Sequence, residues 1–205
     1  MSDVKLPAKR EFGFGAYVSG AAFAANGEIA AFALGSGVVK LVTVADNSVR
    51  DVAVHKGASL ALVPHPDGVS FLSGGDDGRL VRIGADGTLA EIAKFQGKWI
   101  DVLAAHKSGG IACGLGKEIR YWAPGAAEPR ALGPHTSTVA ALDFSPDGSR
   151  IAAAHYGGAS IWQVRNPGGV PRRLDWKGSH IAIKYAPNAK FLATTTQDNA
   201  IHVWR

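Results

Sequence analysis

The sequence predicts an all-β chain built from five repeats of a four-stranded antiparallel unit. A short polar turn recurs along the chain with a nearly constant interval. The turns are Asn26-Gly27, Asp67-Gly68, Ser108-Gly109, Asp147-Gly148 and Asn188-Ala189, and their first residues are 41, 41, 39 and 41 positions apart. A constant interval of this length indicates repeated structural units. Each turn separates two short apolar runs, so each predicts a β-hairpin.

The unit is clearest in residues 138–162. Here two apolar runs flank Ser145-Pro146-Asp147-Gly148, where the proline presets φ at the second position and the glycine frees the fourth. A second reversal is expected at His155-Tyr156-Gly157-Gly158, followed by a third strand over residues 159–164 that carries Trp162. A strand, a tight turn, a strand and a second turn therefore define the repeat.

The other units follow the same order. First strands are expected at residues 21–24, 60–63, 102–105, 139–144 and 181–185, and second strands at 29–34, 69–72, 111–113, 151–154 and 191–194. Third strands are expected at 38–44, 79–83, 118–122, 159–164 and 200–204. Residues 48–54, 88–94, 126–132 and 171–175 are more polar, and some of these runs carry proline, which suits an outer edge strand.

Runs that are apolar on both faces indicate sheets covered on both sides, as in blades packed around an axis. With the period and the third-strand tryptophan, they resemble the WD-repeat β-propeller family, with degenerate repeats of the bacterial type, over residues 16–205. The closest matches run from Pro134-His135 to Asp147-Gly148 and over residues 192–204. The resemblance implies an N-terminal segment, 1–15, and units at about 16–54, 55–94, 95–133, 134–175 and 176–205.

Members of that family form a buried tetrad from a histidine before the first strand, a serine or threonine in the second strand, an aspartate in the second turn and a tryptophan in the third strand. No unit here matches all four positions. The matches are His55, Ser73 and Asp77 in the second unit, His135 and Trp162 in the fourth, and Thr194, Asp198 and Trp204 in the fifth. Trp176 stands where the fifth histidine is expected. We interpret these residues as structural, because such groups find partners inside a blade without a substrate.

Composition narrows the class of protein. The 205 residues are 46% hydrophobic and 19% charged, which is typical of a globular chain. The single cysteine, Cys113, lies in an apolar run and is expected to be buried and free, as suits a cytoplasmic protein. The charge of +5 is scattered, so no specific nucleic-acid partner is predicted. No uninterrupted apolar stretch is long enough to predict a membrane span.

Catalytic and metal-binding signatures are missing from the sequence. The glycines of Gly13-Phe14-Gly15 and Gly114-Leu115-Gly116-Lys117 do not have phosphate-loop spacing. The seven histidines are spread over several units without metal-ligand spacing, and no nucleophile elbow occurs. We therefore predict no enzymatic activity, cofactor or metal.

The loops that enter the first strands and the turns that join the second and third strands are expected to emerge at one end as a rim. The predicted partner-binding residues on this rim are Lys56, Asp76, Lys98, Trp99, Tyr156, Trp176, Lys177 and Gln197. Aromatic residues beside lysines suit a protein partner. Alternatively, Trp99 and Trp176 pack between blades.

The family resemblance implies a noncatalytic scaffold for protein–protein interaction. One alternative is a propeller enzyme or small-ligand binder with a channel site built from several blades. A second alternative is a weak polyanion binder driven by the net charge.

The fifth unit reaches Trp204-Arg205 without a fourth strand. The resemblance favours seven blades, which at about 40 residues each would need about 75 more residues than are present. We therefore expect an open arc, completed by further C-terminal residues or by a second subunit, with exposed blade faces that favour self-association. The alternative is a closed five-bladed ring in which residues 10–18 supply the missing strand.

Overall fold

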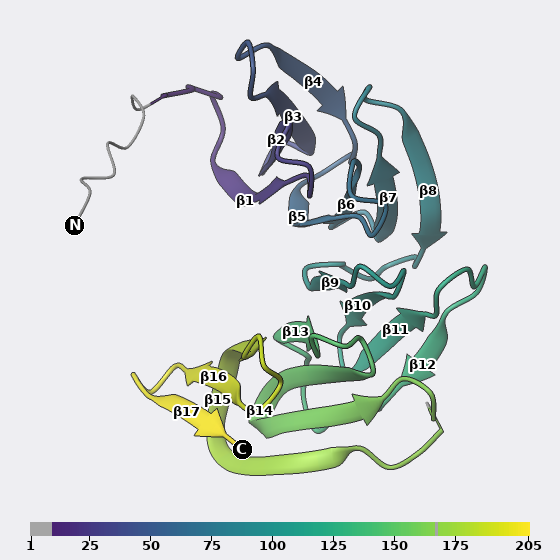
Figure 1. Cartoon of the computed structure of the whole chain (residues 1–205), viewed down its shortest axis with the longest axis vertical. Helices are drawn as coiled ribbons and strands as arrows, with labels where there is room; N and C mark the ends of the chain where they lie inside the picture. Colours follow the sequence, from purple (N-terminus) through teal and green to yellow (C-terminus); the bar gives the residue numbers. More distant parts are fainter. Residues whose placement is uncertain (1–9, 167) are drawn as a thin grey trace.

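The structure is a computed structural model that describes residues 10–166 and 168–205. These residues form seventeen β-strands in four antiparallel sheets, which follow one another around an open arc (Figure 1). The described part of the chain contains no α-helix, and so no helix that could cross a membrane. The predicted all-β fold of an open propeller is confirmed.

The first three sheets are simple four-stranded meanders. The first contains β1 (Val18–Phe23), β2 (Ile29–Leu34), β3 (Val38–Thr43) and β4 (Val49–Ala53). The second contains β5 (Ser59–Pro64), β6 (Phe71–Gly75), β7 (Arg79–Ile83) and β8 (Leu89–Lys94). The third contains β9 (Leu103–Ala105), β10 (Ile111–Leu115), β11 (Glu118–Trp122) and β12 (Arg130–Leu132). Each fourth strand forms an edge of its sheet, as the polar runs predict.

The fourth and fifth predicted units share one five-stranded sheet. It contains β13 (Ala141–Phe144), β14 (Arg150–Gln163), β15 (Arg172–Tyr185), β16 (Leu192–Thr196) and β17 (Ile201–Trp204). β14 includes both the second and the third predicted strands of the fourth unit. Val164 N nevertheless donates to Ser149 O at 3.0 Å, although a straight strand of this length would separate its ends by about 45 Å. The chain therefore folds back within β14, where Gly157 and Gly158 have φ of 94° and 129°.

β15 joins the two units because its two halves pair with different strands. Its first half pairs with β14, with Leu174 opposite Ala159, and its second half pairs with β16, with Ile183 opposite Thr194. Between these halves Ser179 pairs with Tyr156 after a register shift, and Gly178 has φ of 131°. The sequence indicated separate fourth and first strands, whereas the structure makes them one.

The hydrophobic core lies between neighbouring units. Ala31 and Leu41 of the first sheet pack in one cluster with Phe71 and Ile83 of the second. Similar clusters join the second sheet to the third, the third to the fourth unit, and the fourth unit to the fifth. The first strands contact one another in turn along the inner side of the arc (Figure 1). Sheets within the arc are thus covered on both faces, which explains their two-sided apolar runs.

Cys113 is fully buried in the cluster between the second and third sheets. Burial raises the pKa of its thiol to about 12, so almost no thiolate exists at neutral pH. The cysteine therefore acts as a small apolar core residue.

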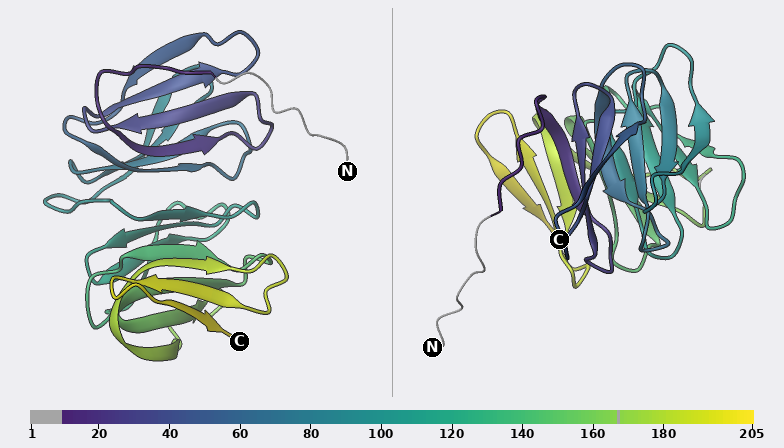
Figure 2. Two further views of the ribbon diagram at one scale, coloured as in Figure 1. Left: turned by 90° about the vertical axis from the view of Figure 1, so that its left-hand side faces the viewer. Right: turned by 90° about the horizontal axis from the view of Figure 1, so that it is seen from above.

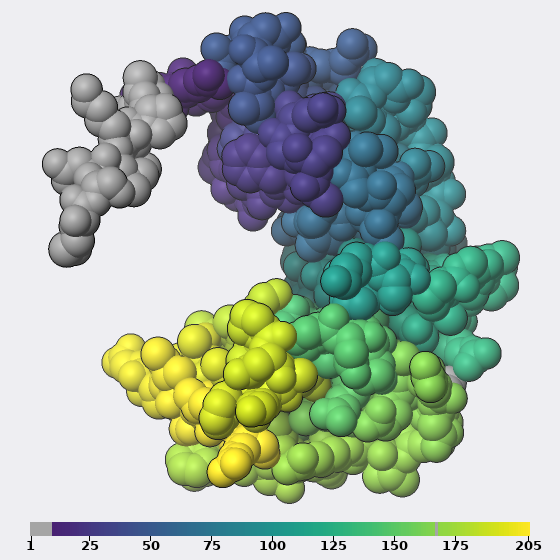
Figure 3. Space-filling model, viewed as in Figure 1, coloured from purple at the N-terminus to yellow at the C-terminus, as the bar shows by residue number. Residues whose placement is uncertain are grey.

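The two ends of the arc stand apart, and the space-filling view shows the concave side open between the purple and yellow units (Figure 3). The alternative prediction was that residues 10–18 form a closing strand. Of these residues, only Val18 is in a β-strand, at the start of β1. Instead, Phe14 packs on Phe32 of β2 with ring centroids 5.3 Å apart, and Arg10 Nη1 donates to Val44 O at 2.6 Å. The segment therefore covers part of the outer face of the first sheet.

The opposite end of the arc also exposes apolar side chains. Ile201 and Val203 of β17 are 71% and 65% exposed, and Ile181 of β15 is 45% exposed. β17 is the last strand of its sheet and lies at a free edge (Figure 2). The fifth unit thus presents both an apolar face and an unpaired strand edge to solvent.

Candidate functional site

Loops and turns gather at one end of each unit, and backbone hydrogen bonds hold them together. Phe95 N donates to Gly78 O at 2.8 Å, which links the loop entering the third unit to a turn of the second. His135 N donates to Lys117 O at 2.8 Å, and Gln197 N donates to Ser179 O at 3.1 Å. Each of these bonds fixes a loop or strand end to a nearby turn.

The aromatic residues of the predicted rim are exposed. Trp99, Tyr156 and Trp176 are 66%, 55% and 53% exposed, respectively. The polar rim residues that are also exposed are Lys56, Lys98, Lys177 and Gln197, whereas Asp76 is half-buried. Because Tyr156 pairs with Ser179, it lies on the strand next to Trp176. Trp99 comes from the loop between β8 and β9, in a different unit.

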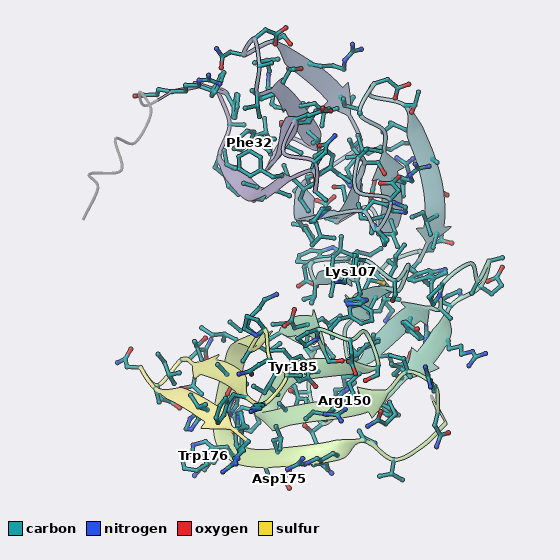
Figure 4. All side chains as sticks on the ribbon, viewed as in Figure 1. Phe32, Lys107, Arg150, Asp175, Trp176 and Tyr185 are labelled. Carbon is teal, nitrogen blue, oxygen red and sulfur yellow. The ribbon has the colours of Figure 1, made fainter. Side chains whose placement is uncertain are left out.

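Trp176 packs on its own unit rather than between blades. Its ring lies 4.4 Å from the ring of His202 and meets Trp204 edge-on at 6.4 Å. Figure 4 shows Trp176 at the outer surface beside the fifth unit. One face of the indole is therefore supported while the rest stays in solvent.

In the second unit, the predicted tetrad residues form a complete hydrogen-bonded chain. His55 Nδ1 donates to Asp77 Oδ1 at 2.9 Å, and His55 Nε2 accepts from the Ser73 hydroxyl at 3.0 Å. Ser73 in turn lies 3.0 Å from the hydroxyl of Ser59. Every polar atom of this chain has a partner without any ligand, so its geometry supports the structural interpretation.

Burial and hydrogen bonding also set the charges of His55 and Asp77. Burial lowers the pKa of His55, which keeps the imidazole neutral, although Asp77 partly opposes the shift. Burial alone would raise the pKa of Asp77, but hydrogen bonds from Arg79 N and His55 outweigh it and hold that pKa below its usual value. A neutral imidazole and an ionised carboxylate therefore face each other.

In the fourth unit, Trp162 Nε1 donates to His135 Nε2 at 3.0 Å, and His135 Nδ1 donates to Lys117 O at 2.9 Å. The family's turn aspartate is absent here. Instead His155, only 2% exposed, accepts from Ser160 through Nε2 at 2.8 Å and donates to Tyr156 O through Nδ1. The sequence pattern did not indicate this buried role, because His155 stands at the expected turn of residues 155–158.

In the fifth unit, the structure corrects the interpretation that Trp176 replaces the histidine. His180, which is fully buried, lies with Nδ1 3.0 Å from Thr194 Oγ1, and that hydroxyl accepts from Trp204 Nε1 at 3.1 Å. Asp198 is exposed. Sequence spacing placed the histidine before the strand, whereas β15 is continuous and carries it inside. The only sequence signal was a histidine directly before an apolar run.

A hollow of about 310 Å³ beside the fourth unit is a candidate for the alternative function, a small-ligand or catalytic site. Its lining includes His155 and Ser160, a hydroxyl–imidazole pair of the kind that activates a nucleophile. Both side chains are almost fully buried, at 2% and 4% exposed, and the Nδ1 atom of His155 also donates to Tyr156 O at 2.9 Å. Among the described residues, no three potential metal ligands converge.

Residues 128–163 and 174–205 each match the family model described as WD domain, G-beta repeat. These two segments are similar to WD repeats. The two matched segments contain most of the five-stranded sheet from β13 to β17. No curated protein matches the chain. WD repeats generally serve as scaffolds for protein–protein interaction, and the family is typically non-enzymatic.

Proposed function

We propose that this WD-repeat chain is a noncatalytic scaffold that binds a protein partner through its rim. The observation that carries the proposal is that Trp99, on the loop between β8 and β9, and Tyr156 and Trp176, on the paired strands β14 and β15, are each more than half exposed. Large aromatic side chains are usually well buried in a folded chain. At interfaces they supply much of the binding energy from a small area.

The geometry favours binding over chemistry. The buried histidines of the second and fourth units are occupied by protein partners, and the described residues form no metal cluster. The exposed aromatics come from two regions of the arc, so a partner that contacts all of them spans several units. A cytoplasmic location remains a prediction.

Replacing Trp99, Tyr156 and Trp176 together by alanine is expected to abolish capture of a partner from lysate of the native host. Each anchor of this kind contributes about 2 kcal/mol or more, so three losses reduce affinity by several orders of magnitude. The melting temperature should stay close to that of the parent chain, because all three side chains are exposed.

The matched control removes three exposed apolar side chains from the other end of the units: Phe23, Val69 and Phe191. This control variant should capture the partner as the parent chain does. If the rim variant also retains capture, the binding site lies elsewhere on the arc.

We also propose that a second copy of the chain packs against the exposed face of the fifth unit. Sedimentation at micromolar concentration should then show species heavier than the monomer, because Ile201 and Val203 are exposed on that face. Replacing both by lysine should restore the monomer. Val170→Lys is the control, since Val170 is 95% exposed in a loop and its change should leave association unaltered. A compact, protease-resistant monomer of the parent chain would refute self-association.

A further inference from the structure

A hollow of about 780 Å³ opens between the second and third units at the rim. One wall is formed by residues 94–98, at the end of β8 and in the loop that follows. The other wall is formed by residues 115–120, around the turn between β10 and β11, with Pro134 beside them. A hollow of this size accommodates several side chains of a ligand.

The lining carries an excess of positive charge. Its cations are Lys94, Lys98, Lys117 and Arg120, and its only carboxylate is Glu118. Arg120 lies 2.9 Å from Glu118, so these two charges offset each other. Among the described residues, no carboxylate forms an ion pair with any of the three lysines. A concave surface lined by one sign of charge concentrates the potential that attracts an anionic ligand.

The lining also contains apolar side chains, and backbone hydrogen bonds hold its walls. Phe95, Leu115 and Pro134 line the hollow, where Leu115 is only 7% exposed and Phe95 is half-buried. Lys98 N donates to Phe95 O at 3.1 Å, and Lys117 O accepts from His135 N at 2.8 Å. The backbone that carries Lys98 and Lys117 is therefore held in place.

We propose that this hollow binds an acidic peptide segment of the partner. Aspartate or glutamate carboxylates of the segment pair with Lys94, Lys98 and Lys117, and one apolar side chain packs on Phe95 and Leu115. The proposal builds on the proposed scaffold function and names the chemistry of its partner. Trp99 directly follows Lys98 and is two-thirds exposed, so the same partner reaches both.

A peptide fits this hollow better than a nucleic acid does. Single-stranded nucleic acids are bound by a basic groove that follows the backbone together with aromatic side chains on which bases stack. The only aromatic side chain in this hollow, Phe95, is half-buried in its lining. The group of lysines together with Phe95 and Leu115 matches a short segment with mixed acidic and apolar side chains.

The test measures binding of a labelled peptide of glutamates with one leucine, by fluorescence anisotropy with the whole chain. Replacing Lys94, Lys98 and Lys117 together by glutamine should weaken binding by about tenfold or more, since each exposed pair contributes about two- to fivefold. Raising the ionic strength from about 0.05 M to about 0.5 M should also weaken binding to the parent chain.

The matched control changes three exposed cations elsewhere, Lys107, Arg165 and Lys190, to glutamine, which lowers the net charge by the same amount. This control should bind the peptide nearly as the parent does. An equal loss in both variants would overturn the proposal, because attraction would then come from the net charge alone. An oligonucleotide that outcompetes the peptide in the hollow would also overturn it, as would a phosphoserine peptide that binds more than tenfold more tightly.

The two proposals fail in different ways. If the parent chain binds no acidic peptide while lysate capture through the aromatic rim persists, the acidic-peptide proposal fails and the scaffold function stands. If the peptide binds the hollow while the variant without Trp99, Tyr156 and Trp176 captures partners normally, the proposed aromatic binding site is wrong. The acidic-peptide proposal is then upheld.

Discussion

Trp162→Ala is expected to lower the free energy of unfolding by about 3 to 5 kcal/mol, the usual cost of removing a buried aromatic side chain. Trp162 is 7% exposed and belongs to the apolar cluster between the third and fourth units. Its indole also meets the His135 ring edge-on at 5.7 Å and donates to it. Chemical denaturation measures the loss directly.

Two further variants separate packing from hydrogen bonding at this site. Trp162→Phe keeps an aromatic ring but leaves His135 Nε2 without its donor, so we expect a loss of about 1 to 3 kcal/mol beyond any packing change. Trp176→Ala serves as the control, because that indole is 53% exposed and should cost much less. Trp204 is half-buried, so its replacement should have an intermediate effect. An unchanged unfolding curve for Trp162→Ala would show that the indole is not packed as described.

Acidification from about pH 7 to about pH 5 is expected to destabilise the chain through its buried histidines. Burial lowers the pKa values of His55, His135 and His180 below the ordinary value of 6.5. In the unfolded chain these groups take up protons as the pH falls through 6.5, whereas in the folded chain they remain neutral. The unfolded state then binds more protons, so stability falls with decreasing pH.

The effect can be large because three groups act together. Between its folded and unfolded pKa values, each histidine lowers the free energy of unfolding by up to about 1.4 kcal/mol per pH unit. The three histidines together lower it by up to about 4 kcal/mol per pH unit. The aspartates with lowered pKa values, such as Asp77 and Asp147, lose their contributions only at lower pH, below about 4. Denaturant midpoints measured from about pH 7 to about pH 3 distinguish the effect of the histidines from that of the aspartates.

His180→Asn provides the internal comparison for the pH prediction. This variant should be less stable than the parent at pH 7, because it loses the contact with Thr194. Its stability should nevertheless depend less steeply on pH between about 6.5 and 5, since one proton-binding site is gone. An unaltered slope would show that His180 does not contribute to acid sensitivity.

The repeat and its hairpins were predictable because their signals are local. Gly27, Gly68, Gly109 and Gly148 all adopt positive φ at the turns that the sequence indicated, where a side chain would be strained. In the fifth turn Ala189 occupies this conformation with φ of 58°, so the repeated geometry persists without the glycine. The hydrogen-bonding pair of His135 and Trp162 could also be anticipated, because both residues lie at the positions that the repeat assigns to them.

By itself, then, the sequence determined the strand order, the turn positions and the two-sided apolar character of the units, since backbone conformation and side-chain alternation act over a few residues. Only the tertiary structure decided that β15 runs from one unit into the next and brings His180 to Thr194, because its two halves pair with different strands, β14 and β16. Only the tertiary structure gathered Lys94, Lys98 and Lys117 around one hollow. These lysines come from neighbouring units, and the packing of one sheet against the next sets the distance between them.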